Sequence, residues 1–284
     1  MEQQASKGLQ EIDIKKIFYE KNPKVARWVP GFIYRYLKKI AHQDYTNEII
    51  RDYGHLKGFE FTKAMIKHFN VTLEVEGEEN IPDSGKYIFA SNHPLGGFDG
   101  HTIMYIIGHK YGADKFKFLV NDILMNLKNM DEVFIPVNKH GGQGHQLAQQ
   151  LDEAFQSDAQ ILTFPAGFVS RKVKGQVMDL VWQKNFITKS KQYQRDIVPI
   201  FHSGKNTKYF YRLYQIRKFL GIKANIEMLY LIDQTYKHRN KKFVVKFGKP
   251  IPWQTFDKSK RPAEWAKWVK DIVYKMGGYT KVPV

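Results

Sequence analysis

Residues Lys86 to Met104 read KYIFASNHPLGGFDGHTIM, the densest collection of chemically usable side chains in the chain. Tyr87 to Ala90 form a short apolar run that is typical of a buried strand. The following residues, Asn92 to Gly97, contain a proline and a pair of glycines, which indicate a sharp turn out of that strand. A helix is predicted to begin near Asp99. The turn would therefore bring the imidazole of His93 close to the carboxylate of Asp99.

A histidine and an aspartate placed in this way have a definite chemical use. A carboxylate that accepts the proton of one imidazole nitrogen fixes the tautomer, so the other nitrogen can act as a general base on a hydroxyl or an amine. The alternative is structural, because Asp is a favoured helix N-cap and a histidine after a strand often makes only structural hydrogen bonds. From this pair alone, both interpretations of His93 and Asp99 stay open.

Length and composition indicate a globular protein with a sizeable core. The chain has 284 residues, of which 43% are hydrophobic, which suits one large α/β domain with an appendage or two small domains. It contains no cysteine, so disulfide bonds, thiolate catalysis and cysteine-based metal sites are excluded. No stretch reaches the roughly 18 consecutive apolar residues that would span a bilayer.

The formal net charge of +17 predicts a positive field that attracts anionic partners. Three kinds of partner qualify: nucleic acid, anionic lipid head groups, and an acidic protein such as an acyl carrier. The aromatic content of 14% suits the first two, through base stacking or through rings at a membrane interface. Charge alone does not choose among them.

Residues 1–69 are predicted to form an N-terminal helical segment, and residues 70–284 the α/β domain. Lys24 to His42 has apolar residues at intervals of three and four, with arginines and lysines on much of the remaining surface, which predicts one basic amphipathic helix. Tyr45 to Phe69 continues the pattern. Basic amphipathic helices that carry aromatic side chains can lie in a membrane interface. The alternative is that these helices pack on each other and on the following domain.

From Val71 onward, short apolar runs alternate with helical segments. This alternation is typical of an α/β fold with a largely parallel (mixed) sheet flanked by helices. In such sheets ligands bind beyond the carboxyl ends of the strands, which is where His93 falls. Strands are predicted at 71–75, 87–90, 116–120, 133–137, 161–164, 197–201 and 243–247, and helices at 99–111, 144–156 and 262–275. The stretch from Lys205 to Lys223 is rich in Tyr, Phe, Arg and Lys, which is compatible with a second surface element of unassigned role.

The motif Asn92-His93-Pro94 followed by Asp99-Gly100 resembles the first motif of the glycerolipid acyltransferase superfamily. That superfamily includes the 1-acyl-glycerol-3-phosphate acyltransferases, in which a His and an Asp form a catalytic dyad. The spacing here is one residue longer than is usual in that family. The form with Pro-Leu-Gly-Gly-Phe between the two resembles a variant branch, called hemolysin-like, that is linked to acylation of ornithine and glycine lipids.

Further segments follow in the order that this superfamily requires, over roughly residues 70 to 252. Phe134 to Lys139 resembles its second block, Ile197 to Ile200 its fourth, and Gly248 to Ile251 a sequence found near the end of these domains. The third block is carried by Phe164, Pro165, Ala166 and Gly167. It differs from the familiar Phe-Pro-Glu-Gly by having Ala166 for the Glu, and it is followed by Val-Ser-Arg ending at Arg171. This departure resembles the variant branch, and the acceptor could therefore differ from lysophosphatidate.

Several basic residues follow the predicted strands at the edge that carries His93. Lys139, Arg171 and Lys172, with His140 and Lys174 beside them, would suit an anion clamp for a phosphate or carboxylate. The acceptor head group is predicted to bind to the first three. The alternative for each lysine is an ordinary solvated surface charge, and for Arg171 both interpretations stay open.

The resemblance implies an acyltransferase that moves a fatty acyl group from acyl carrier protein or acyl-CoA to the hydroxyl of a lyso-lipid, either lysophosphatidate or a lyso amino-acid lipid. His93 would be the base, Asp99 its orienting partner, and the Gly96-Gly97 backbone a source of oxyanion donors. No metal or other cofactor is expected, because a thioester is already activated and the acceptor needs only deprotonation. The expected location is peripheral, on an anionic membrane surface at the cytoplasmic face of the inner membrane.

Two other functions are compatible with the residues. The first is a metal-dependent hydrolase, because His93, Asp99 and His101 lie close in sequence and all can bind metal. The second is a basic nucleic-acid-binding protein, which the charge and aromatic content favour but which no binding motif supports. Nucleic acid is therefore not an expected partner.

Overall fold

The core of the protein is a seven-stranded sheet with the strand order β1-β9-β8-β2-β5-β3-β4. The computed structural model describes residues 10–120, 127–137 and 144–280. Neighbouring strands are parallel except β8 and β9, which are antiparallel. This arrangement confirms the predicted largely parallel, mixed sheet. The strands are β1 (Thr72–Glu76), β2 (Tyr87–Ser91), β3 (Phe116–Val120), β4 (Phe134–Pro136), β5 (Gln160–Thr163), β8 (Asp196–His202) and β9 (Lys242–Phe247).

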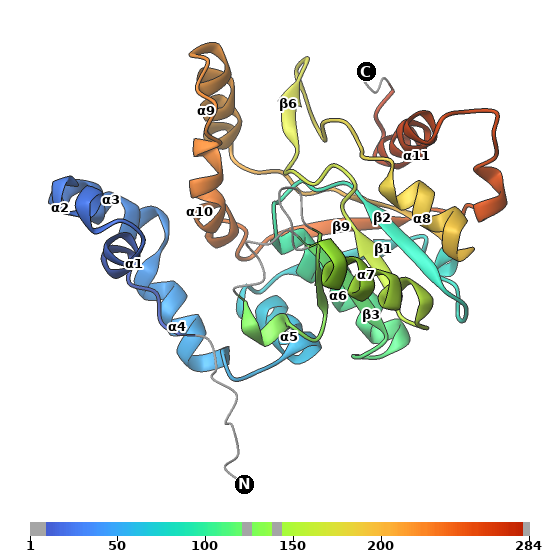
Figure 1. Ribbon diagram of the computed structural model, residues 1–284, viewed down its shortest axis with the longest axis horizontal. Helices are drawn as coiled ribbons and strands as arrows, with labels where there is room; N and C mark the ends of the chain where they lie inside the picture. Colours follow the sequence, from blue (N-terminus) through green and yellow to red (C-terminus); the bar gives the residue numbers. More distant parts are fainter. Residues whose placement is uncertain (1–9, 121–126, 138–143, 281–284) are drawn as a thin grey trace, which may run out of the picture.

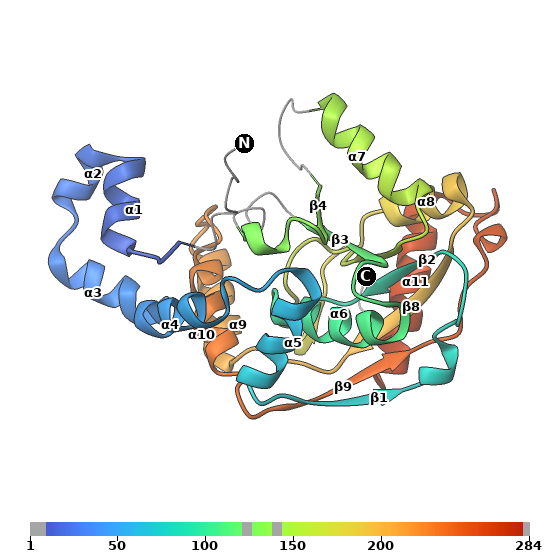
Figure 2. The same ribbon diagram turned by 90° about the horizontal axis from the view of Figure 1, so that it is seen from below.

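Helices cover both faces of this sheet (Figures 1 and 2). On one face, α5 (Gly58–His68) and α6 (Phe98–Tyr111) share an apolar cluster with Phe89 of β2. On the other face, α7 (Gly144–Gln156), α8 (Asn185–Tyr193) and α11 (Pro262–Met276) pack with Ile88. Successive side chains of a strand point to opposite faces, so a strand that is covered on both sides is apolar throughout. The continuous apolar run of β2 has this cause.

The structure contains elements that the apolar pattern does not predict. A hairpin of β6 (Arg171–Val173) and β7 (Gln176–Met178) follows the third block, and α8 comes next in the chain. The stretch from Lys205 to Tyr236 forms a protrusion built from α9 (Lys208–Phe219), η4 (Ile226–Tyr230) and α10 (Leu231–Tyr236). Other short 3-10 helices are η1 (Glu78–Asn80), η3 (Lys128–Met130) and η5 (Trp253–Thr255).

The first three helices form an N-terminal arm that extends to one side of the sheet (Figures 1 and 2). They are α1 (Ile14–Lys21), α2 (Pro23–Trp28) and α3 (Gly31–Ile40). The prediction of a single helix from Lys24 to His42 is therefore wrong, because this stretch divides into α2 and α3. Pro30 has no N–H to donate and disfavours the helical conformation at Val29, so the chain bends between α2 and α3.

The second part of the N-terminal segment is packed against the domain. It divides into α4 (Gln43–Tyr53) and α5. Aromatic side chains of α5 belong to the buried core, and Tyr45 and Tyr53 of α4 pack against it. The packing alternative therefore holds for α4 and α5. By contrast, α2 and α3 expose Trp28, Phe32 and Tyr36.

The N-terminal arm and the protrusion are in direct contact. The hydroxyl of Tyr36 on α3 is hydrogen-bonded to that of Tyr230, to which Tyr209 also donates at 3.0 Å. Close by, His42 Nε2 lies 2.9 Å from Asp233 Oδ1, and its ring stacks on Tyr236. In both ribbon views the arm and the protrusion lie on the same side of the sheet (Figures 1 and 2).

Candidate active site

The turn between β2 and α6 holds a hydrogen-bonded histidine and aspartate. β2 ends at Ser91 and α6 begins at Phe98. His93 lies in the turn and Asp99 is the second residue of α6. His93 Nδ1 lies 2.9 Å from Asp99 Oδ2, and the His93 side chain is 15% exposed. Because Nδ1 is bonded to the carboxylate, Nε2 is the nitrogen through which the imidazole can act on a substrate. The structure thus brings together the two groups that the sequence singles out.

Asp99 is fully buried, and several donors surround its carboxylate. The backbone N–H groups of Leu95, Gly97 and Gly100 donate to it at 2.9, 3.0 and 3.1 Å. Burial acts to raise the pKa of Asp99, but the charge and hydrogen bond of His93 lower it well below the ordinary value. Asp99 is therefore ionised, and it holds both the imidazole and the turn in place.

The two glycines of the turn differ in what they do. The N–H of Gly97 donates to Asp99, which corrects the expectation that it serves as an oxyanion donor, because a carboxylate already occupies it. Gly96 has φ +84°, and a Cβ there would lie 2.5 Å from Cγ2 of Val169 and 2.8 Å from Cδ2 of Leu231. Only glycine fits such a position, both for its backbone conformation and for the space available.

The third block meets the dyad because β5 is the parallel neighbour of β2, so their carboxyl ends lie at one edge of the sheet. The ring of Phe164 stacks on the imidazole of His93 with 4.1 Å between ring centroids. Ala166 is buried, and the chain turns at Gly167, which has φ +61°. Pro165 accepts a hydrogen bond from Gln183 N–H through its carbonyl. This block therefore supports one face of the base.

A buried aspartate that the sequence does not single out holds the backbone of the base. The N–H of His93 donates to Asp179 Oδ1 at 3.2 Å. Ser170 Oγ donates to the same oxygen, and the Ser170 N–H donates to the carbonyl of His93 at 2.8 Å. Trp182 Nε1 donates to Asp179 Oδ2 at 2.8 Å. Burial raises the pKa of Asp179 despite these donors. No motif marks this residue, which lies 86 positions from His93.

A second set of buried polar groups links β2, α6 and β8. The side chain of Asn92 exchanges two hydrogen bonds with the backbone of His202, at 2.7 and 3.0 Å. His202 Nε2 lies 3.0 Å from Thr102 Oγ1, which donates to the carbonyl of Asp99 at 2.8 Å. Burial lowers the pKa of His202 to about 4, so this ring is neutral near pH 7. These hydrogen bonds therefore connect the dyad to β8.

Comparison with known proteins places the chain in a family. A family model described as Acyltransferase matches residues 16–277, which include the dyad, the third block and Asp179. The chain belongs to this acyltransferase family. The resemblance inferred from the sequence motifs is thereby confirmed, whereas the roles of the individual residues remain predictions.

Curated relatives of this acyltransferase are similar over nearly their whole length. The chain is 49% identical over 265 residues to the lyso-glycine lipid O-acyltransferase of Bacteroides thetaiotaomicron, covering 93% of this chain and 97% of the relative. It is 46% identical to the protein of the same name from Phocaeicola vulgatus, covering 93% and 95%. Among solved structures, the 1-acyl-sn-glycerophosphate (LPA) acyltransferase PlsC from Thermotoga maritima matches with 14% identity and a TM-score of 0.47, covering 87% of this chain and 98% of that one.

Arg171 of the acyltransferase does not lie at an open rim. Its side chain is 3% exposed and Nη2 lies 2.9 Å from Glu227 Oε1, while Nη1 donates to the carbonyl of Val169 at 2.7 Å. The head-group role of Arg171 stays a prediction, and its burial disfavours that role because the guanidinium already pairs with Glu227 inside the protein. The sequence shows Arg171 only as a basic residue after a turn. Its acidic partner, Glu227, comes 56 residues later, so no local pattern reveals the pair.

The other basic residues of the predicted clamp have different positions. Lys172 is exposed on the β6–β7 hairpin, and Lys174 is exposed at its turn. Lys139 and His140 lie outside the described residues. The structure therefore leaves Lys172 as the described member of the predicted head-group set that faces solvent.

His101 of the acyltransferase lies two residues after Asp99 in α6 but faces α5. Its Nδ1 is 3.2 Å from Thr62 Oγ1, and burial lowers its pKa to about 4. His93, Asp99 and His101 therefore do not form one ligand set. Over residues 10–120, 127–137 and 144–280, no group of three or more His, Cys, Asp or Glu side chains is arranged to hold a metal ion.

The position of Asp179 predicts a role in holding the base. We expect Asp179→Asn to lower the free energy of unfolding by about 1.5–3 kcal/mol, because an amide replaces a charged acceptor of buried hydrogen bonds. We also expect the rate of acyl transfer to fall, since the His93 backbone loses part of its support. Urea unfolding and initial rates measure the two effects. Trp182→Phe is the control for the rate, because it removes core volume and the bond to Oδ2 but leaves the bond from His93 to Oδ1. An equal loss of rate in that variant would contradict the role.

Proposed function

We propose that this acyltransferase moves a fatty acyl group from a thioester donor, acyl carrier protein or acyl-CoA, to the hydroxyl of a lyso-glycine lipid. The observation that carries the proposal is the hydrogen bond between His93 and the buried, ionised Asp99. The family match and the printed names of two relatives support the lyso-lipid acceptor. The donor carrier is proposed from its chemistry, since both carriers present the same activated thioester.

In the proposed reaction, Nε2 of His93 takes the proton of the acceptor hydroxyl as its oxygen attacks the thioester carbonyl. Asp99 keeps the Nδ1 proton in place and stabilises the imidazolium that forms. The tetrahedral intermediate collapses to the ester, the carbon–sulfur bond breaks, and the imidazolium gives its proton to the departing thiolate. The N–H of Gly96 remains the proposed oxyanion donor from the turn. No protein nucleophile is needed, because binding holds the two substrates together.

The head-group site is proposed at the exposed cations near the third block. The burial of Arg171 leaves Lys172 in that role, with Lys139 as the other predicted member. Among the described residues, no group of side chains is arranged to hold a metal ion, and no described feature favours nucleic-acid binding.

The proposal is tested with purified protein, an acyl carrier protein thioester or an acyl-CoA, and a panel of lyso-lipids. The panel contains lysophosphatidate and the lyso forms of glycine and ornithine lipids, and mass spectrometry identifies the products. We expect the O-acylated glycine lipid to form fastest. Faster acylation of lysophosphatidate would overturn the proposed acceptor, and formation of free fatty acid alone would overturn acyl transfer.

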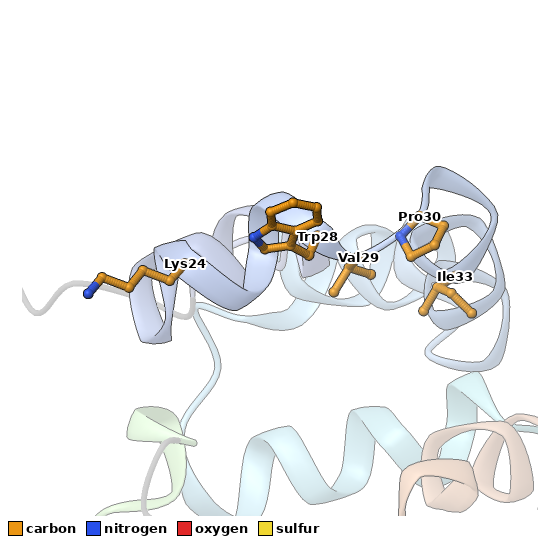
Figure 3. A pocket seen from close by; sticks show the side chains of 5 residues that line it. All are labelled: Lys24, Trp28, Val29, Pro30 and Ile33. Carbon is orange, nitrogen blue, oxygen red and sulfur yellow. The ribbon is translucent and has the colours of Figure 1, made fainter.

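The N-terminal arm supports a peripheral location on an anionic membrane, which we propose to be the cytoplasmic face of the inner membrane. Trp28 is 87% and Phe32 is 60% exposed. An apolar pocket of about 480 Å³ lies beside Trp28 on α2 and the start of α3 (Figure 3), lined by Lys24, Trp28, Val29, Pro30 and Ile33. Within the described parts of the chain, no helix combines the length and the apolar character needed to cross a bilayer. These features fit a helix pair that lies in the interface.

We expect the wild-type protein to co-sediment with anionic vesicles more than with neutral ones, and to lose part of this binding at high salt. Changing Trp28 and Phe32 to Ser should weaken it further. Each basic residue near an anionic surface contributes about 1 kcal/mol, so neutralising four exposed cations of α2 and α3 together should remove a large part of the binding. The four exposed cations chosen for this change are Arg27, Arg35, Lys38 and Lys39.

A matched control neutralises four exposed lysines on α8 and before α11, on the opposite side of the protein from the arm (Figures 1 and 2). They are Lys184, Lys191, Lys258 and Lys260. Equal losses in the two sets would show a general charge effect and not docking by the arm. A wild-type protein that stays in the supernatant would refute membrane association.

A further inference from the structure

The protrusion ends in a group of large apolar side chains that face solvent. Phe219 is 90% and Leu220 is 60% exposed at the carboxyl end of α9, and Ile216 and Ile222 beside them are also exposed. Single apolar residues on a surface are common, but contiguous groups of this kind mark interaction sites. In Figure 1 this end of the protrusion is the part of α9 that points furthest from the sheet.

Buried charges hold this apolar end in a fixed place. Glu227 of η4 is fully buried between Arg171 of β6, at 2.9 Å, and Arg217 of α9, at 2.8 Å. Arg217 also donates to the carbonyl of Ile222 at 2.9 Å, which closes the loop after α9. The guanidinium of Arg171 in turn lies over the ring of Tyr214. The exposed end is therefore attached to the domain by a structured base.

The charges around this end are of one sign. The exposed charged side chains from residue 205 to residue 232 are all basic. The acidic side chain in that range, Glu227, is buried in its ion pairs, and Asp233, the next one, is paired with His42 and Lys237. The exposed basic residues are Lys205, Lys208, Arg212, Lys218 and Lys223. Apolar side chains on an element whose exposed charges are all basic complement an anionic lipid surface.

The protrusion that carries the apolar end contacts the arm at the opposite end of α9 from Phe219. The hydroxyls of Tyr36, Tyr230 and Tyr209 form a chain of hydrogen bonds between α3 and α9. The base of the protrusion also reaches the active-site turn, because Leu231 of α10 fills the space above Gly96. The arm, the protrusion and the turn of the dyad are thus in contact through named residues.

We propose that the end of the protrusion, residues 216–223, is a second membrane anchor that inserts Phe219 and Leu220 into the lipid surface beside the arm. The occupant is the anionic surface of a bilayer. The inference rests on the proposed peripheral location and adds to it. Two anchors on one surface allow a single orientation, in which the edge of the sheet that carries His93 lies next to the membrane where a lipid acceptor enters.

The absence of cysteine from the chain makes a direct test possible. Phe219→Cys, and separately Lys258→Cys as a matched exposed control, are labelled in the full-length protein with an environment-sensitive dye. Vesicles of phosphatidylglycerol and phosphatidylcholine are added, with or without nitroxide-labelled lipid. We expect a blue shift and nitroxide quenching at position 219 and neither at position 258. A dye at position 219 that stays in water while Trp28→Cys enters the lipid would overturn the second anchor.

Other occupants give different results. If a second copy of the chain covers this end, sedimentation without vesicles will show a dimer that Phe219→Ser with Leu220→Ser converts to a monomer. If an acidic carrier protein covers it, the dye at position 219 will respond to acyl carrier protein and not to vesicles. Either result would overturn the proposal.

The same double variant links the anchor to catalysis. We expect Phe219→Ser with Leu220→Ser to weaken vesicle binding by about tenfold or more, because two large apolar side chains leave the lipid. The KM for acceptor presented in vesicles should rise, while the rate with acceptor in detergent micelles should not change. Vesicle binding is measured without turnover, so failure of acyl transfer would leave it unaffected. Unchanged vesicle binding in the variant would contradict the proposal whatever the enzyme acylates.

Discussion

His93→Ala is expected to reduce acyl transfer by about 10²–10⁴-fold, the usual contribution of a general base, and to leave the fold intact. The side chain is partly exposed and its hydrogen bond goes to Asp99. Its backbone bonds to Asp179 and Ser170 do not depend on the imidazole. Initial rates at saturating substrate, with circular dichroism and urea unfolding on the same preparations, measure both effects.

Asp99→Asn should also lower the rate severely, because an amide nitrogen facing Nδ1 would favour the wrong tautomer. The structure adds a second effect. Oδ2 of Asp99 accepts from Leu95 as well as from His93, so the Asn variant should weaken the turn and lower stability too. For this reason His93→Ala is the cleaner test of the dyad.

The double variant separates joint action from independent action. If Asp99 acts only through His93, the two changes together should be hardly slower than His93→Ala alone. His55→Ala, an exposed histidine on the loop before α5, is the matched control and should keep full activity. Near-normal activity in His93→Ala would end the dyad interpretation.

Glu227→Gln is expected to destabilise the protein by about 3–5 kcal/mol, because removing one member of a buried ion pair leaves uncompensated charge. Here two guanidinium groups, those of Arg171 and Arg217, would lose their anion together. Urea or thermal unfolding measures the loss. Glu20→Gln is the control, since its pair with Lys16 is 3.9 Å long and well exposed, and such pairs contribute about 0–1 kcal/mol.

A second variant, Arg171→Ala, decides the role of Arg171 when its stability and its KM for the lyso-lipid are both measured. If Arg171 serves the fold, Arg171→Ala should lower stability by a similar amount, and the surviving folded enzyme should use its acceptor nearly normally. If it binds the acceptor, as the position after the third block suggests, the KM for the lyso-lipid should rise while stability is unchanged. A Glu227→Gln variant as stable as the wild type would contradict the ion-pair account.

The sequence by itself determines the layers of this acyltransferase and the heart of its site. Strands covered on both faces are continuous apolar runs, so β2 and the Ile197 to Phe201 part of β8 are visible without coordinates, and the 3.6-residue period shows α7 and α11. The contact between His93 and Asp99 is also local. One proline and two glycines bend the chain between residues six positions apart, so the sequence is sufficient to predict it.

Only the tertiary structure decides the contacts that join distant segments. Asp179 reaches His93 across 86 positions, Glu227 reaches Arg171 across 56, and Tyr230 reaches Tyr36 across 194. Periodicity reports whether a residue is buried and on which face, but it does not report the partner. Thus a basic residue after a turn indicates an anion site equally well whether its anion is a ligand or a buried glutamate. Which one it is depends on where the topology places the acid, and here the folding of the protrusion onto β6 brings Glu227 to Arg171.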